Sequence, residues 1–313
     1  MEYALFLGCT TPVRSLNYEL SARKVANTLG IELLDIDNFE CCGYPLKAVD
    51  QHTALVLAGR NLCLAEERGL NICTLCSACT GTLAEANRQL KENPVLHRHV
   101  NQTLDKTLGR SYQGTVEVEH FARILFQDLG LEKIGERINT DLSPLRLAAH
   151  YGCHYLKPSH IYEHIEDPEY PHSLDDLIEV TGAESIHYEG RNRCCGGGVL
   201  AVDEAVALTM AKEKLDRVAA AKGDAIVLFC PFCDIMYEYS QRKIEKTFHT
   251  RYGLPILYLP QLVGLALGLS PDEVGFGLNR IKPGDLLKKV APMASTRDTK
   301  QKSTGIIETE AER

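Results

Sequence analysis

Short apolar runs alternate with longer amphipathic segments along the first half of the chain. The apolar runs have the length of strands in a buried sheet, and they lie at 4–7, 32–36 and 70–75. The longer segments carry apolar residues at helical spacing, and they lie at 16–29, 53–67 and 83–90. Alternation of strands and helices predicts an α/β fold with a parallel sheet.

The second half repeats this order of elements. Its predicted strands lie near 147–151, 185–188 and 225–229. Its predicted helices lie near 204–221 and 235–246. Each half also ends in a similar stretch, 116–131 and 256–269, which predicts a strand followed by a helix. We therefore expect one α/β module present twice.

Ten of the twelve cysteines follow the same repeat. Each half has a single cysteine preceded by glycine, then a Cys-Cys-Gly triplet, then a Cys-x-x-Cys pair. The double cysteine and the Cys-x-x-Cys pair are separated by 33 residues in the first half and 34 in the second. The first set is Cys9, Cys41, Cys42, Cys76 and Cys79. The second set is Cys153, Cys194, Cys195, Cys230 and Cys233.

Each group of cysteines follows a predicted strand and precedes a predicted helix. The carboxyl ends of parallel strands meet at one edge of the sheet, which is the usual ligand edge of open α/β folds. We therefore expect the five cysteines of each half to gather there. Glycines after the double cysteines, Gly43 and Gly196, suit a loop that turns sharply around a bulky group.

Composition narrows the class of protein. The 313 residues are 44% hydrophobic and 24% charged, which is typical of a soluble globular protein large enough for two domains. The net charge of −8 argues against a nucleic-acid partner, which needs clustered lysine and arginine. No apolar stretch approaches the roughly 20 residues of a membrane span, and no export signal is present, so we expect a cytoplasmic protein. Thiols stay reduced there, which favours metal or redox chemistry over disulfides.

The number of cysteines in each set helps to identify the metal site that they form. Zinc and cubane four-iron clusters both use four ligands, and either would leave one cysteine of each half idle. Five repeated thiols fit an expanded or non-cubane iron–sulfur cluster better. A zinc-stapled scaffold or a thiol-based redox sensor is the non-enzymatic alternative. The two other cysteines, Cys63 and Cys73, have no such pattern; Cys73 corresponds to Val227 in the repeat and is predicted to be a buried packing residue.

This duplicated signature resembles the family of heterodisulfide reductase B subunits, which are built from two CCG domains. The resemblance implies two pseudo-symmetric Rossmann-like domains, which we place at 1–143 and 144–291, followed by a polar and flexible tail at 292–313. It also implies that each set of five cysteines binds a non-cubane [4Fe–4S] cluster. In the family the two clusters face each other across a pseudo-two-fold axis, with a disulfide substrate between them.

The resemblance further implies an oxidoreductase that reduces, or forms, a disulfide between two thiol cofactors or substrates. Its electrons would come from two partners, a ferredoxin-like iron–sulfur protein (the C subunit of such complexes) and a flavoprotein (the A subunit). The chain itself has no ferredoxin motif, because no cysteine followed by proline completes the run from Cys73 to Cys79. The alternative is an electron-relay subunit of a lactate or glycolate dehydrogenase, which uses similar domains without a disulfide.

Residues beside the cysteine loops are candidates for the remaining chemistry. His154 is the nearest titratable group to Cys153 and a candidate proton donor, although an ordinary loop histidine is the alternative. Five basic residues could steer an anionic substrate or could be solvated surface charge. They are Arg14, Lys47, Lys157, Arg191 and Arg193.

Overall fold

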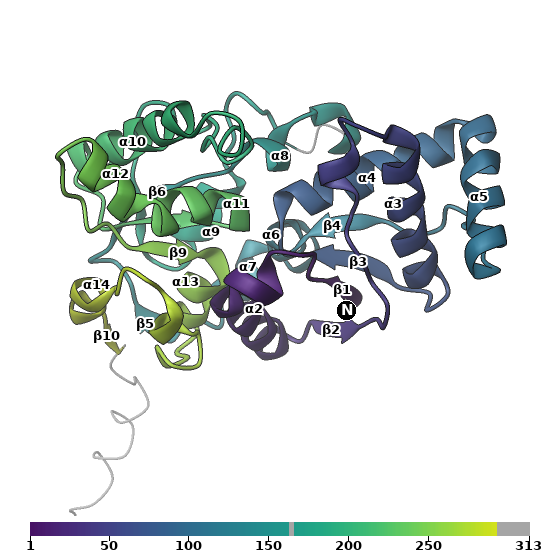
Figure 1. The fold of residues 1–313 in the computed structure, drawn as a ribbon. Helices are drawn as coiled ribbons and strands as arrows, with labels where there is room; N and C mark the ends of the chain where they lie inside the picture. The colour runs from purple at the N-terminus through teal and green to yellow at the C-terminus, as the bar shows by residue number, and fades with distance from the viewer. Residues whose placement is uncertain (163–165, 293–313) are drawn as a thin grey trace, which may run out of the picture.

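Two four-stranded parallel sheets form the centres of the two halves of the molecule (Figure 1). The computed structural model describes residues 1–162 and 166–292. The first sheet, in the order β2-β1-β3-β4, consists of β1 Glu2–Phe6, β2 Glu32–Asp35, β3 Asn71–Thr74 and β4 Val118–His120. The second, in the order β7-β6-β8-β9, consists of β6 Arg146–Ala149, β7 Glu184–Ser185, β8 Ala225–Leu228 and β9 Ile256–Tyr258. The prediction of a duplicated α/β fold with parallel sheets is confirmed.

The two sheets have the same register at their central strands. Leu5 of β1 lies opposite Cys73 of β3, and Ala149 of β6 lies opposite Val227 of β8. Cys73 is therefore the counterpart of Val227, and both side chains are fully buried. A thiol in the middle of a strand packs as a small apolar side chain, as the sequence predicts for Cys73.

The longer helices cover the sheets. They are α2 Leu16–Leu29, α3 Gln51–Glu66, α4 Ser77–Glu92, α5 Pro94–Leu108 and α10 Glu204–Ala220. Helix α2 has the predicted bounds, whereas α4 begins six residues before the predicted 83. The early turns of α4 hold small polar residues that are buried, so they lack a visible apolar stripe. The hydroxyls of Thr80 and Thr82 are satisfied by donating to backbone carbonyls four residues earlier.

Shorter helical segments make up the rest of the fold. The predicted helix at 235–246 is divided into a π-helical turn η4 Ile235–Tyr239 and α12 Gln241–Thr247, and the short helix α11 Pro231–Asp234 precedes it. A second π-helical turn, η2 Ile124–Leu129, follows α6 Phe121–Arg123. The others are α1 Thr11–Arg14, η1 Tyr44–Leu46, α7 Leu131–Gly135, α8 Cys153–Leu156, η3 Ser159–Tyr162, α9 Ser173–Glu179, α13 Leu259–Ala266, η5 Phe276–Leu278 and α14 Gly284–Lys289. None of the helices within 1–162 and 166–292 is long and apolar enough to cross a bilayer.

Buried aromatic residues join the two halves. The rings of Tyr18 in α2 and Tyr258 in β9 stack with centroids 4.1 Å apart. The hydroxyl of Tyr18 donates to the carbonyl of Phe229 at 3.0 Å, and that of Tyr258 donates to Ser15 Oγ at 2.8 Å. His120 Nε2 also donates to the Phe229 carbonyl, because its Nδ1 accepts from a backbone N–H. The backbone just before Cys230 is thus fixed by two side chains of the first half.

The segment between the sheets contacts the second half. Strand β5 Thr140–Asp141 pairs antiparallel with β10 Ala291–Pro292, and Asn139 N–H donates to the carbonyl of Ala266 at 2.8 Å. The predicted domain boundary at 143 falls between β5 and β6, and it stays a prediction. Of the tail predicted at 292–313, only Pro292 lies within the described residues.

Candidate metal centre

The cysteines lie where the predicted strands end and the following helices begin. Cys76 and Cys230 are the residues that precede α4 and α11, and Cys79 and Cys233 lie in the first turns of those helices. The backbone N–H groups at a helix N-terminus favour negative charge on both Cys-x-x-Cys pairs. Hydrogen bonds with neighbouring thiols, and then burial, nevertheless raise the pKa of Cys79 and Cys233 in the metal-free chain.

The two sets have the same burial pattern. Three cysteines of each set are buried: the second cysteine of the Cys-Cys-Gly triplet and both cysteines of the Cys-x-x-Cys pair. The other two members are more accessible: Cys41, Cys153 and Cys194 are partly exposed, and Cys9 is exposed. Each half thus presents a sulfur-lined site whose outer edge reaches solvent.

The first set lines one hollow. All five of its cysteines face this hollow together with Tyr44 and Phe232. The thiol of Cys79 hydrogen-bonds to Cys42 and lowers the pKa of Cys42 to about 7. Gly8 allows the backbone to approach, since a Cβ there would lie 2.9 Å from Cys79 Sγ.

The second set forms a continuous chain of thiol contacts. Cys194 contacts Cys153 and Cys195, Cys195 contacts Cys233, and Cys233 contacts Cys230. The hydrogen bond from Cys153 is the largest cause that lowers the pKa of Cys194. Each set therefore stabilises at least one thiolate, which is the form that binds metal.

The two sets meet at Cys76 and Cys230. Their thiols are in hydrogen-bonding contact, and the contacts from Cys233 and then Cys76 hold the pKa of Cys230 well below its usual range. Neither set is an isolated site, because the two sets adjoin at Cys76 and Cys230.

This donor set fits iron–sulfur clusters. All twelve cysteines are free thiols, so no ligand candidate is held in a disulfide. Thiolate sulfurs are the ligands of such clusters, and backbone N–H groups commonly hydrogen-bond to those sulfurs. The N–H groups of Gly43, Gly196 and Gly197 point at cysteine sulfurs at 3.4–3.5 Å.

Tyr44 is a site residue that the sequence interpretation missed. Its ring lies edge-on to His154, with centroids 5.1 Å apart, and also contacts Phe232. Burial raises the pKa of Tyr44, and so do the nearby thiols of Cys153, Cys230 and Cys194. Tyr44 thus reaches from the first half to the second set. The only signal in the sequence is that the first Cys-Cys-Gly is followed by tyrosine and the second by glycine.

His154 lies at the edge of the second set. Its Nδ1 is 3.5 Å from Cys153 Sγ, and its carbonyl accepts a hydrogen bond from Tyr162 at 2.5 Å. The ring is partly exposed and faces Tyr44. The structure therefore places His154 between solvent and the sulfurs.

Most of the predicted basic residues are bound to carboxylates. Lys47 pairs with Glu85, Lys157 with Glu169 at 2.5 Å, and Arg193 with Glu213 at 3.5 Å. Arg14 is exposed at the end of α1, and within the described part of the chain it has no ion pair. Their steering of an anionic substrate stays a prediction, with Arg14 the freest of the set.

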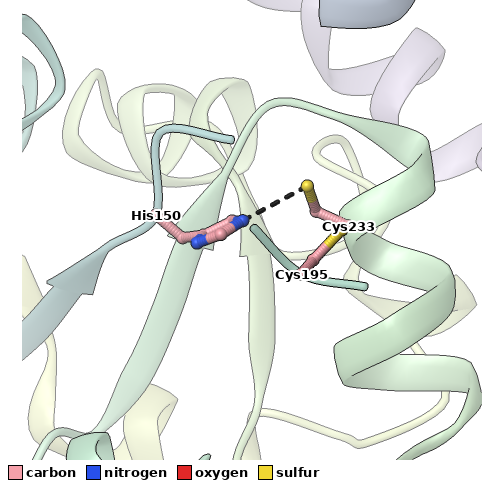
Figure 2. Close-up of side chains that lie close together, drawn as sticks. All are labelled: His150, Cys195 and Cys233. Atoms are coloured by element: carbon pink, nitrogen blue, oxygen red, sulfur yellow. Dashed lines mark hydrogen bonds between the residues drawn. The ribbon is translucent and has the colours of Figure 1, made fainter. Parts of the chain in front are cut away.

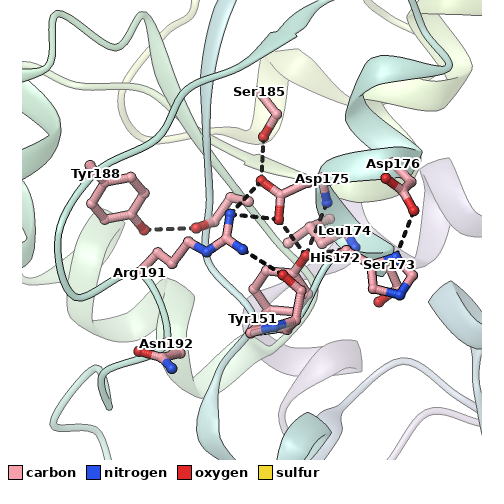
Figure 3. Close-up of polar contacts among 12 residues, drawn as sticks. Tyr151, His172, Ser173, Leu174, Asp175, Asp176, Ser185, Tyr188, Arg191 and Asn192 are labelled. Carbon is pink, nitrogen blue, oxygen red and sulfur yellow. Dashed lines mark hydrogen bonds and ion pairs between the residues drawn. The ribbon is translucent and has the colours of Figure 1, made fainter. Parts of the chain in front are cut away.

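Arg191 supports the fold beside the second set (Figure 3). It is ion-paired with Asp175 at 3.1 Å and donates to the carbonyl of Pro171 at 2.6 Å. Asp175 also accepts hydrogen bonds from Tyr151 and Ser185. This network anchors the loop before Cys194 to α9 and engages two of the three guanidinium nitrogens of Arg191.

His150 is the second site residue that the sequence interpretation missed (Figure 2). Its Nε2 lies 3.2 Å from Cys233 Sγ, and one donor atom each of His150, Cys195 and Cys233 lie within 4.8 Å of one another. The histidine follows an apolar strand, so the pattern predicts only the last residue of a core segment. The available signal is that the repeat places a phenylalanine, Phe6, at the same position in the first half.

Comparison with known proteins agrees with this geometry. A model of the CCG cysteine-rich domain matches twice, at residues 3–84 and 147–238. The chain is 39% identical over 293 residues to the B subunit of the ferredoxin/F(420)H(2)-dependent CoB-CoM heterodisulfide reductase of Methanosarcina acetivorans, and the match covers 92% of this chain and 97% of that protein. It is 32% identical to the 8-methylmenaquinol:fumarate reductase membrane anchor subunit of Wolinella succinogenes, over 90% of this chain and 97% of that protein.

A solved structure shares the fold. The crystal structure of a hypothetical protein from Helicobacter pylori aligns with a TM-score of 0.72 and 18% identity, over 90% of this chain and 52% of that one. The double domain match and the relative of nearly equal length agree on the family. With its two CCG cysteine-rich domains, the chain belongs to the family of heterodisulfide reductase B subunits.

Proposed function

We propose that this chain is the catalytic iron–sulfur subunit of a heterodisulfide reductase-like complex. In this proposal the first set of cysteines holds one non-cubane [4Fe–4S] cluster and the second set holds the other. The observation that carries the proposal is the contact between Cys76 and Cys230, which makes two five-sulfur sites adjacent. Two adjacent centres suit a disulfide substrate, because both of its sulfur atoms must be reduced.

The overall reaction is R–S–S–R′ + 2e⁻ + 2H⁺ ⇌ R–SH + R′–SH. Iron–sulfur clusters supply electrons one at a time, so two neighbouring centres match the two electrons that a disulfide requires. The residues of the chain hold the site and limit the access of water. Tyr44 and Phe232 contact each other and line the hollow beside the first set together with Cys76.

Thiol products require protons, and His154 is placed to deliver one. It is partly exposed, so its ring can exchange protons with solvent, and its Nδ1 faces the sulfur of Cys153. A proton held on Nδ1 would be within reach of a substrate sulfur bound beside Cys153.

Replacing His154 tests this assignment. We expect His154→Gln to lower disulfide turnover by about 10²-fold, because glutamine can hydrogen-bond but cannot transfer a proton at neutral pH. Turnover is measured with reduced viologen as electron donor, and iron content is measured on the same sample. Full turnover with unchanged iron would rule out the proton-donor role.

The name of a relative indicates which electron donors this chain would use. The Methanosarcina acetivorans relative is named as the B subunit of a reductase, and that name includes ferredoxin and F(420)H(2). We infer two partner subunits, one a ferredoxin-like iron–sulfur protein and the other a flavoprotein. Outside the two sets this chain has only Cys63 and Cys73, which are too few to hold an ordinary cubane cluster.

Electron paramagnetic resonance of the anaerobic protein tests substrate binding. We expect 2-mercaptoethanesulfonate, an anionic thiol, to change the signal of the oxidised clusters, because a substrate sulfur would bind next to iron. Ethanesulfonate has the same charge without the thiol and serves as the control. An identical spectrum with thiol, control and buffer would contradict the disulfide function.

The alternative is an electron-relay subunit that binds no disulfide, as in the dehydrogenase interpretation. The fumarate reductase relative favours it, because the name of that protein includes no disulfide substrate. The same spectra decide between the two, since a relay predicts clusters that are reduced by a partner and ignore added thiol.

A further inference from the structure

Two positions beside the sulfurs differ between the halves. The repeat pairs Gly8-Cys9 with Gly152-Cys153, so Phe6 corresponds to His150. Phe6 is fully buried at the end of β1 and packs on Phe39, with ring centroids 5.2 Å apart. His150 is 1% exposed and contacts Cys233 through Nε2 at 3.2 Å. The first half therefore has an apolar ring where the second half has a hydrogen-bonding one.

The proton of His150 lies on the nitrogen that faces the sulfur. Nδ1 is buried and makes no well-formed hydrogen bond among the described residues, although the carbonyl of Arg191, which accepts from Lys214 at 2.8 Å, lies close to the ring. A proton on Nδ1 alone would turn the Nε2 lone pair towards Cys233 Sγ, and a metal-bound thiolate has no proton to donate to it. A proton on Nε2 has Cys233 Sγ as acceptor, and a doubly protonated ring also carries one there. In either form Nε2–H donates to the sulfur.

Tyr237 holds the ring of His150 in this orientation. Tyr237 packs edge-on against His150, with centroids 4.9 Å apart and an interplanar angle of 82°. The Tyr237 hydroxyl has no partner in the described structure, so its role at this site is packing.

The halves also differ at a residue that holds the double-cysteine loop. Gly43 packs on Ala54 and Gly196 on Ala207, and seven residues further along these helices Asn61 corresponds to Lys214. Asn61 holds the first double-cysteine loop by donating to the Cys41 carbonyl at 3.1 Å. Lys214 is 1% exposed and holds the second loop through the carbonyls of Gly190 and Arg191. The second half thus uses a lysine amine for the task that an amide performs in the first.

We propose that His150 is a positioning residue that raises the reduction potential of the second-half cluster above that of the first, by donating Nε2–H to the Cys233 thiolate. This inference rests on the proposed function, because it requires one cluster in each half. Reduction adds negative charge to a cluster, and hydrogen bonds to its sulfurs stabilise that charge. The step is the reduction of the second-half cluster: it takes up one electron from a one-electron donor, and His150 keeps its proton.

This difference in reduction potential sets the order in which the two clusters are reduced. The first electron settles on the second-half cluster, next to His154 and the proton supply. The first-half cluster is reduced afterwards, at lower potential.

The test is a redox titration of the anaerobic, cluster-loaded full chain with dithionite, followed by electron paramagnetic resonance. We expect two one-electron steps for the natural protein. In His150→Phe, which copies the first half, the ratio of reduced to oxidised second cluster at a fixed potential should fall at least tenfold, a shift of about 59 mV. The other step should stay in place. His150→Gln retains an N–H donor and should recover part of the shift.

Matched variants separate hydrogen bonding from packing and folding. Tyr237→Phe removes the unpartnered hydroxyl, so both steps should remain unchanged. Phe6→His introduces a donor in the first half and should raise the lower step, which keeps the inference testable where His150→Phe fails to assemble. An unmoved potential in His150→Phe with full iron, or a lower step that Phe6→His does not raise, overturns the inference. A natural protein with only one cluster would instead overturn the proposed function.

Discussion

Cys230→Ser should reduce the iron content from about eight to about four atoms per chain and lower disulfide turnover by at least about 100-fold. Cys230 is buried, and its thiol contacts both Cys233 and Cys76. A serine hydroxyl is a much weaker ligand for iron than a thiolate, so the second cluster should be lost. The first set keeps its five sulfurs, so under the proposed function the remaining iron should belong to the first cluster. Iron analysis and reductase assays on anaerobic protein measure both effects.

Cys73→Ala is the matched control. Cys73 is also a fully buried cysteine, but it lies inside β3, and its pKa is raised by burial and by the charge of Glu119. Removing its sulfur should cost about 1 kcal/mol of stability and leave the iron content at about eight. Full iron in Cys230→Ser, or a loss of four irons in Cys73→Ala, would refute the assignment of ligands.

The sequence predicts the repeat well because both halves obey the same local rules. Helix α2 is found at its predicted bounds, since apolar residues at helical spacing face the core along its whole length. Strand β7 is the counterexample, because only Glu184–Ser185 pairs with β6. Ile186 still donates its N–H to the Leu147 carbonyl at 2.8 Å, but the chain then leaves the ladder, and Tyr188 instead donates its hydroxyl to the carbonyl of Ala149 at 2.7 Å. A pattern of apolar residues reports burial but does not distinguish a strand from a buried loop.

The grouping of cysteines within each half was predictable, because strand ends define the sheet edge. The contact between Cys76 and Cys230 was not, since it depends on how the halves pack through Tyr18 and Tyr258. Contacts between residues far apart in the sequence also determine which basic residues are free to bind a substrate. The carboxylate that pairs with Lys47, for example, belongs to Glu85 in α4. Spacing along the chain carries no information about such contacts.

Gly43→Ala should lower the free energy of unfolding by about 2–4 kcal/mol. Gly43 has φ of +93°, which is strained for any residue with a Cβ, and an added Cβ would lie 2.7 Å from the Ala54 carbonyl oxygen. That oxygen belongs to the backbone of α3, so it cannot rotate away. The loop would have to move, and with it Cys42 and the N–H that points at Cys41 Sγ. Urea unfolding of anaerobic protein measures the stability, and iron analysis should show loss from the first cluster.

The repeat supplies the comparison for this variant. Gly196 has φ of +87° and would place a Cβ 2.9 Å from the Ala207 carbonyl oxygen, so Gly196→Ala should destabilise similarly but lose iron from the second cluster. Gly284 begins α14 with nothing within 4 Å of an added Cβ, and Gly284→Ala should be neutral or stabilise by up to about 1 kcal/mol. If Gly43→Ala matched Gly284→Ala in stability and kept all of its iron, the close packing of the double-cysteine loop on α3 would not be what holds the first set of sulfurs in place.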